Sequence, residues 1–236
     1  MTRFISIILF LFIPLSLVGA TFEASPQLKS TGQLKVGYFS LQNRDYFETQ
    51  VKPFFAKGSQ YGKSYEVVDL NVYSEQGTTE LKLIEKTLSQ LDSSYQVLLF
   101  DFNLVSSAET QALEELLTKK SNEGALLLAS AGKKTENKNV YPLSLTVFGK
   151  NPKVIVLGER DRRDRIPMDS HFGPEMLTAL RAPQELEGKD AGAIIFGAKL
   201  AQHWKKKKSD EWIPYFREKK EKNKRLWLDL ENIFPW

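Results

Sequence analysis

The sequence predicts an α/β protein: a three-layer, doubly wound and mainly parallel sheet with helices on both faces. Two observations carry this prediction. Short apolar segments alternate along the chain with longer segments of helical periodicity. The segment 95–102, "YQVLLFDF", is almost continuously apolar, as expected of a strand that is buried on both faces. Alternation of strand and helix favours a parallel sheet covered on both sides.

Five apolar segments are predicted as strands because polar or glycine-containing stretches bound them. They are residues 34–39, 65–73, 95–102, 124–132 and 153–159.

Three segments show helical patterns. The first, 78–91, places on one face Leu81, Ile84, Leu88 and Leu91. The second, 106–124, does the same with Leu113, Leu116 and Leu117. Ser107 is expected to cap this helix and Gly124 to follow its end. The third, 190–204, is rich in small residues.

The N-terminus is typical of a secretory signal peptide. Arg3 precedes an apolar run, residues 4–18, and small residues end at Ala20, after which cleavage is expected. A run of about 15 apolar residues interrupted by Pro14 is shorter than the roughly 20 that span a membrane. An uncleaved anchor is the alternative. We therefore expect a secreted or periplasmic protein.

The predicted organisation is a signal peptide, 1–20; a linker, 21–33; one α/β domain, 34–204; and a basic, aromatic-rich tail, 205–236. The chain contains no cysteine, so neither a disulfide framework nor a lipoprotein anchor is expected. The net charge of +4 comes from the tail, where residues 205–225 include ten Lys or Arg and four Asp or Glu.

The tail permits two interpretations. Its aromatic side chains either dock onto the domain or a partner protein, or lie at a membrane surface while the lysines approach anionic lipid. Pro214 and Pro235 are expected to break a long amphipathic helix, which favours docking. Nucleic acid is not an expected partner because the domain itself is not basic.

Six segments, in order, resemble the subtilisin-like serine proteases. They are "LKVGYFS" (34–40), "QGTT" (76–79), "EGALLLASAGKK" (123–134), "YPLSLTVFGKNPKVIVLGERD" (141–161), "SHFGPEMLTALRAP" (170–183) and "EGKDAGAIIFGAKLA" (187–201). The resemblance implies a subtilisin-like fold. In the family these segments carry the catalytic Asp at the end of a strand, the catalytic His at a corner that opens a helix, the oxyanion Asn and the nucleophilic Ser.

Carried over residue by residue, the resemblance implies a degenerate site. The family's Asp corresponds to Ser40, its His to Gln76 and the second His of that motif to Thr79. Its oxyanion Asn corresponds to Lys133. Its nucleophilic Ser corresponds to Lys189, or to Asp190 in the alternative register.

Acyl transfer by a serine protease needs a hydroxyl activated by a base that accepts a proton near neutral pH. Gln76 cannot accept that proton, so the sequence predicts a catalytically inactive pseudoprotease that binds a protein or peptide. The cleft candidates for binding are Ser40, Gln76, Thr79, Lys133, Lys189 and Asp190.

Two alternatives stay open. A rebuilt hydrolase site would use Ser40 as nucleophile and Lys189 as base, because serine–lysine pairs serve in this way elsewhere. The second alternative is an envelope-associated structural protein whose cleft is vestigial.

No cofactor or metal is expected. The two histidines, His171 and His203, are isolated and show no ligand spacing. The charged run 159–165, "ERDRRDR", is interpreted as a solvated loop because its charges nearly balance.

Overall fold

The computed structural model describes residues 34–59, 65–70, 80–134, 139–186, 190–204, 209–222 and 234. Its centre is a six-stranded sheet in the order β2-β1-β3-β4-β5-β6, and every pair of neighbouring strands is parallel. The strands are β1 (Leu34–Phe39), β2 (Tyr65–Asp69), β3 (Val97–Phe100), β4 (Leu126–Ser130), β5 (Val154–Arg160) and β6 (Met176–Arg181). The predicted fold class is therefore confirmed.

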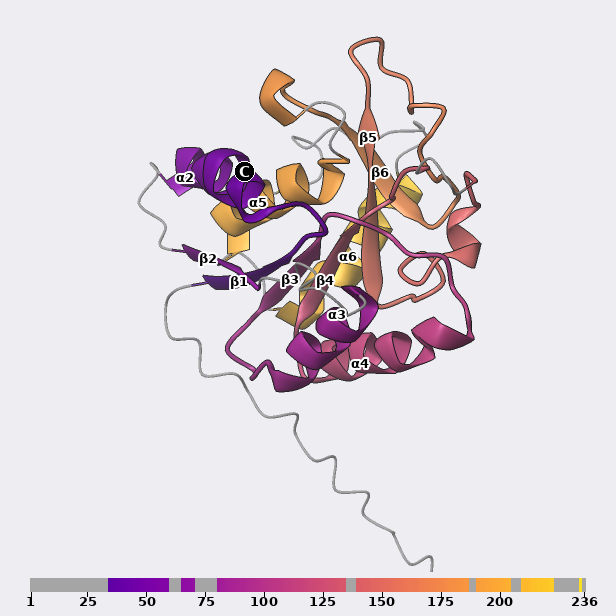
Figure 1. Cartoon of the computed structure of the whole chain (residues 1–236). Coiled ribbons are helices and arrows are strands. Elements are labelled where there is room, and N and C mark those ends of the chain that lie inside the picture. Colours follow the sequence, from indigo (N-terminus) through magenta and orange to yellow (C-terminus); the bar gives the residue numbers. More distant parts are fainter. Residues whose placement is uncertain are drawn as a thin grey trace, which may run out of the picture.

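Helices cover both faces of the sheet (Figure 1). One face carries α3 (Glu80–Gln90) and α4 (Gln111–Asn122). The other carries α2 (Lys52–Ser59), α5 (Gly192–His203) and α6 (Ser209–Lys222). The short helix α1 (Arg44–Tyr46) leads through a π-helical turn, Phe47–Val51, into α2. Three single turns of 3₁₀ helix complete the fold: Ala108–Thr110, Leu143–Leu145 and Gln184–Leu186.

Each of the five predicted strands overlaps an observed one, and β1 has the predicted bounds. Residues 71–73 of the second predicted strand lie outside the described residues. The strand β6 and the helical segment 44–59 were not predicted. The apolar residues of β6 do not alternate strictly with polar ones, so periodicity alone does not find this strand. The helical segment does have a helical spacing, since Phe47, Val51 and Phe55 lie four residues apart, and this signal could have predicted it.

The α3–α4 layer forms as its apolar pattern predicts. Ile84, Leu88, Leu113 and Leu117 are fully buried against the sheet. The Ser107 N–H donates to Thr110 Oγ1 at 2.9 Å at the start of this helical segment. Gly124, with φ of 100°, follows its end in a conformation that favours glycine.

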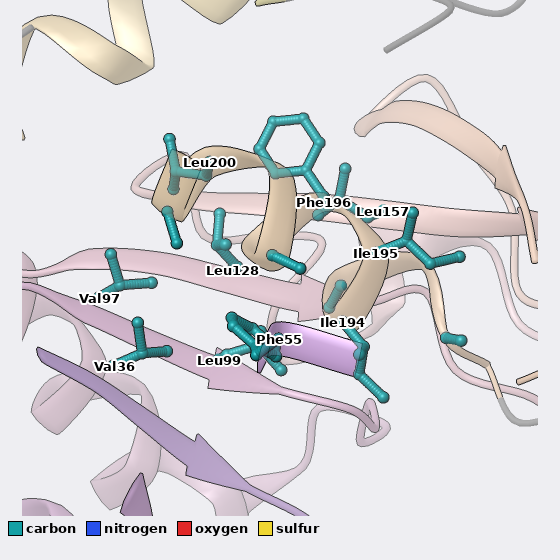
Figure 2. Packing of buried hydrophobic residues seen from close by; sticks show 14 of the residues in the cluster. Val36, Phe55, Val97, Leu99, Leu128, Leu157, Ile194, Ile195, Phe196 and Leu200 are labelled. Atoms are coloured by element: carbon teal, nitrogen blue, oxygen red, sulfur yellow. The ribbon is translucent and has the colours of Figure 1, made fainter. Parts of the chain in front are cut away.

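Helix α5 lies directly on the middle of the sheet. Figure 2 shows its Ile194, Ile195 and Phe196 beside the strand residues Leu99, Leu128 and Leu157, with Phe55 of α2 below. A Cβ on Gly192 would lie 2.4 Å from the Gly158 carbonyl oxygen, and one on Gly197 would lie 2.5 Å from Leu99 Cδ1. The two glycines thus allow the close approach.

The aromatic residues of α6 pack into the same layer. Trp212, Phe216 and Phe234 are buried, and Phe196 of α5 contacts both Phe216 and Phe234. Pro214 lies inside α6, so the expectation that it breaks the helix is wrong there. Trp212 and Phe216 are one helical turn apart, and their joint burial offsets the backbone hydrogen bond that Pro214 removes.

Within the part of the chain that the structure describes, no helix has both the length and the apolar character needed to cross a membrane. The expected signal peptide and linker, residues 1–33, lie outside that part.

Gly192→Ala should destabilise the domain by about 1–3 kcal/mol, because its methyl group meets a backbone oxygen that cannot move alone. This cost should exceed the helix-propensity gain of roughly 1 kcal/mol. Urea unfolding measures the change. Gly197→Ala is the matched control with a smaller expected loss, because the end of the Leu99 side chain can shift. If Gly192→Ala were as stable as wild type or more stable, α5 would not be tightly packed against the Gly158 backbone.

Candidate functional site at the carboxyl edge of the sheet

Each of the four central strands directs a polar side chain toward α5 at its carboxyl end. Successive residues of a strand alternate between the two faces of the sheet. The apolar residues of β1, β3, β4 and β5 that face α5 and α2 are therefore continued by polar ones at the next position on the same face. These are Ser40, Asp101, Ser130 and Glu159, and all four are buried. We call them the polar row.

Asp101 is the hydrogen-bond acceptor of two side chains from β1. Ser40 Oγ donates to Asp101 Oδ2 at 2.6 Å, and the Tyr38 hydroxyl donates to the same oxygen. Burial raises the pKa of Asp101 to about 6, although the bonds from Ser40 and Tyr38 lower it. Ser40 Oγ also accepts the Gln42 N–H at 2.9 Å. The serine hydroxyl thus has its proton directed at a carboxylate.

Glu159 joins the next two elements. Its Oε2 accepts the Ala191 N–H, just before α5, at 3.0 Å. The same oxygen lies 3.5 Å from Lys133 Nζ, which follows β4. The Glu159 side chain is 1% exposed and that of Lys133 16%, so this ion pair is shielded from water and salt.

Asp190 completes the cluster from the start of α5. Its φ of 55° is left-handed, and its carbonyl oxygen accepts a bond of 2.5 Å from Ser130 Oγ. Neither carboxylate oxygen has a hydrogen-bond partner of ordinary geometry, and both are buried. Burial raises the pKa of Asp190 to about 7; Lys133 and the Gly132 N–H oppose this rise, while Glu159 and Asp101 add to it.

Tyr46 of α1 lies over the same cluster. Burial raises the pKa of its hydroxyl above the ordinary value, and the charges of Asp101, Glu159 and Asp190 raise it further. Six elements, β1, β3, β4, β5, α1 and α5, therefore contribute a polar group to one buried site, and its ionisable acids and bases are three carboxyl groups and one ammonium.

The structure brings together three of the six residues that the sequence proposed for the cleft: Ser40, Lys133 and Asp190. The other three, Gln76, Thr79 and Lys189, lie outside the described residues. The proposed Ser40–Lys189 pair thus stays a prediction.

Sequence reasoning missed Asp101, Glu159, Ser130, Tyr38 and Tyr46. The signal that could have found three of them, Asp101, Ser130 and Glu159, is the alternation itself, because a polar residue continues the inward-facing apolar positions of each central strand. The interpretation of 159–165 as a solvated loop is wrong at its start: β5 extends through Arg160, and Glu159 is buried. Asp161 and Arg165 do pair with each other in the connection that follows.

The two histidines lie apart from the polar row. His171 Nδ1 accepts the Tyr141 N–H at 3.0 Å, and burial lowers its pKa. His203 stacks on Phe234 at 5.3 Å between ring centroids, at the other end of α5. Among the residues described, no three His, Asp or Glu side chains are grouped so as to hold a metal ion.

The loop before β6 runs beside this site. Lys133 pairs with Ser170 in an antiparallel bridge, and the His171 N–H donates to the Gly132 carbonyl at 2.9 Å. Phe172 follows and is 59% exposed; Leu145, in the adjoining 3₁₀ turn, is 53% exposed. These two exposed apolar side chains lie on segments that are joined by the bond from the Leu143 N–H to the Phe172 carbonyl.

Comparison with known proteins agrees with this architecture. A lanthipeptide protease superposes with a TM-score of 0.58 and 11% sequence identity over 79% of each chain. MycP1 without its N-terminal propeptide superposes with a TM-score of 0.56 and 11% sequence identity, over 77% of this chain and 82% of the MycP1 chain. The prenylagaramide maturation protease PagA superposes with a TM-score of 0.57 and 13% sequence identity, over 85% of this chain and 92% of the PagA chain. At such identities the similarity establishes the fold of subtilisin-like proteases. No family model and no curated protein sequence matches the chain.

The domain should lose stability as the pH rises from about 5 to about 8. Asp101 and Asp190 have folded pKa values of about 6 and about 7, above the roughly 3.9 of an unfolded Asp. The folded state therefore holds protons that the unfolded state has lost, and this stabilisation disappears as the pH passes the folded values. Scanning calorimetry should show a melting temperature that falls across this range.

Asp101→Asn keeps an acceptor for Ser40 and Tyr38 but has no carboxyl group to titrate. The melting temperature of this variant should therefore fall less steeply with pH than that of wild type. A melting temperature that rises between pH 5 and pH 8 would contradict the assignment of these two buried acids.

Proposed function

We propose that this chain is an exported protein with the subtilisin-like fold that lacks serine-protease chemistry and acts by binding an extended protein or peptide segment at the carboxyl edge of its sheet. The observation that carries the proposal is the bond from Ser40 to Asp101. Where active relatives have the acid that orients the base, this chain has a buried hydroxyl that donates its proton to a neighbouring carboxylate.

Two further features support the absence of acyl transfer. The chain has two histidines, and both are engaged away from Ser40, with Tyr141 and with Phe234. Lys133, at the position of the oxyanion donor, is paired with Glu159. A donor held by a buried carboxylate is not preorganised for a developing oxyanion, and losing one such donor typically costs about 3–4 kcal/mol in the barrier.

Binding is supported by the exposed apolar side chains on the loops near the site. Met168, Phe172 and Leu145 are the exposed large apolar side chains among the described residues, and a bond from the Leu143 N–H to the Phe172 carbonyl joins the segments that carry Phe172 and Leu145. Exposed apolar side chains that gather beside a polar site mark a contact surface for another chain.

Fluorescently labelled, unfolded casein tests this proposal as an extended-chain probe. Fluorescence anisotropy should report saturable binding, and mass spectrometry should find the casein intact. Phe172→Ser and Leu145→Ser should each weaken binding about 5- to 20-fold, as expected for the loss of a large apolar contact worth roughly 1–2 kcal/mol. Lys82→Ser, exposed on α3 across the sheet, is the control that should leave binding unchanged.

Absence of binding, or equal binding by all variants, would overturn the proposal. Casein fragments that disappear in Ser40→Ala would instead establish the rebuilt hydrolase.

A further inference from the structure

Asp190 is an unusual buried acid. It is 6% exposed, and both of its carboxylate oxygens are buried without a hydrogen-bond partner of ordinary geometry. A buried carboxylate that is charged and unpaired costs several kcal/mol, so such a group takes up a proton instead. A proton is also a ligand small enough to reach these oxygens without a change of packing.

The groups around Asp190 come from every element packed against it. Glu159 on β5 and Asp101 after β3 disfavour a charge on it, while Lys133 and the Gly132 N–H, both after β4, favour one. The Tyr46 hydroxyl on α1 and the Tyr38 hydroxyl on β1 lie in the same cluster, and neither carries a charge near neutral pH. A charge on Asp190 would therefore be the third negative charge beside a single ammonium.

The same groups hold the start of α5 in place. Glu159 accepts the Ala191 N–H, Ser130 donates to the Asp190 carbonyl, and Ser130 Oγ is 3.5 Å from the Ala193 nitrogen that donates to it. The left-handed backbone of Asp190 is a strained conformation for a residue with a side chain, and these bonds maintain it. Whatever displaces Glu159 or rotates Asp190 acts on the first turn of α5.

We propose that a proton on Asp190 is the switch that keeps the start of α5 docked on the carboxyl edge of the sheet, and that loss of this proton releases it. The charged carboxylate repels Glu159 and competes for Lys133, so the contacts that fix Ala191 weaken and the segment opens to hydrate the charge. The burial that raises the pKa of Asp190 to about 7 places this change near neutral pH. The switch is a property of the free protein and does not depend on the binding function proposed above.

Hydrogen exchange of the full chain, without ligand, tests the proposal. Amides of the first turn of α5 are compared at pH 5.5 and pH 8.0, each corrected for the intrinsic exchange rate. Wild type should lose at least about tenfold in protection at pH 8.0, whereas the amides of α4 should respond much less. Asp190→Asn should abolish the difference. Asp92→Asn, an exposed acid on a loop, should behave as wild type.

Lys133→Met provides a second test that does not change Asp190. Removing the ammonium disfavours the charged carboxylate, so the midpoint of the protection change should move to higher pH. A wild type without the pH response, an Asp190→Asn variant that retains it, or an unmoved midpoint in Lys133→Met would each overturn the proposal.

Discussion

The close approach of α5 to the sheet is the constraint on which the rest of the structure depends. A helix that presents Gly192 and Gly197 to the strands brings its first turn within hydrogen-bond distance of the carboxyl edge. Because α5 lies so close, the polar side chains at the carboxyl ends of β1, β3, β4 and β5 are buried. If α5 lay farther from the sheet, water could reach these side chains. Once buried, the polar side chains there must find partners within the protein, and Asp101, Glu159 and Lys133 do so.

The carboxyl edge of a parallel sheet is also where doubly wound proteins place their functional groups, because loops and helix starts converge there. In this chain the convergence supplies hydroxyls, carboxyl groups and an ammonium, whereas the His171 ring accepts the Tyr141 N–H and the His203 ring stacks on Phe234. The fold of subtilisin-like proteases is thus combined with a polar centre of different chemistry. The raised pKa values of its two buried aspartates make the stability of the domain depend on pH.

Much of the fold follows from the sequence, and its site follows in part. β1, β3 and β4 are apolar runs between polar breaks, and Leu113 and Leu117 repeat with the helical period, so local pattern determines them. The alignment of motifs placed Ser40, Lys133 and Asp190 at one edge. It assigned no role to Asp101 or Glu159. Strand alternation marks both as inward-facing, but the side chains that they meet depend on long-range pairing, such as the pairing of Phe39 with Phe100. Pro214 in α6 also shows that tertiary packing can override local sequence signals. Proline disfavours a helix, but burial of the neighbouring Trp212 and Phe216 outweighs this preference.

The most direct test of the account is whether Ser40 can be acylated or phosphorylated as a protease nucleophile is. Wild-type protein and Ser40→Ala are incubated with a fluorophosphonate probe at pH 5.5 and pH 8.0, and the intact masses are measured. Neither protein should form an adduct at either pH, because the Ser40 hydroxyl is buried and donates to Asp101. A stoichiometric adduct on wild type that is absent from Ser40→Ala would contradict it.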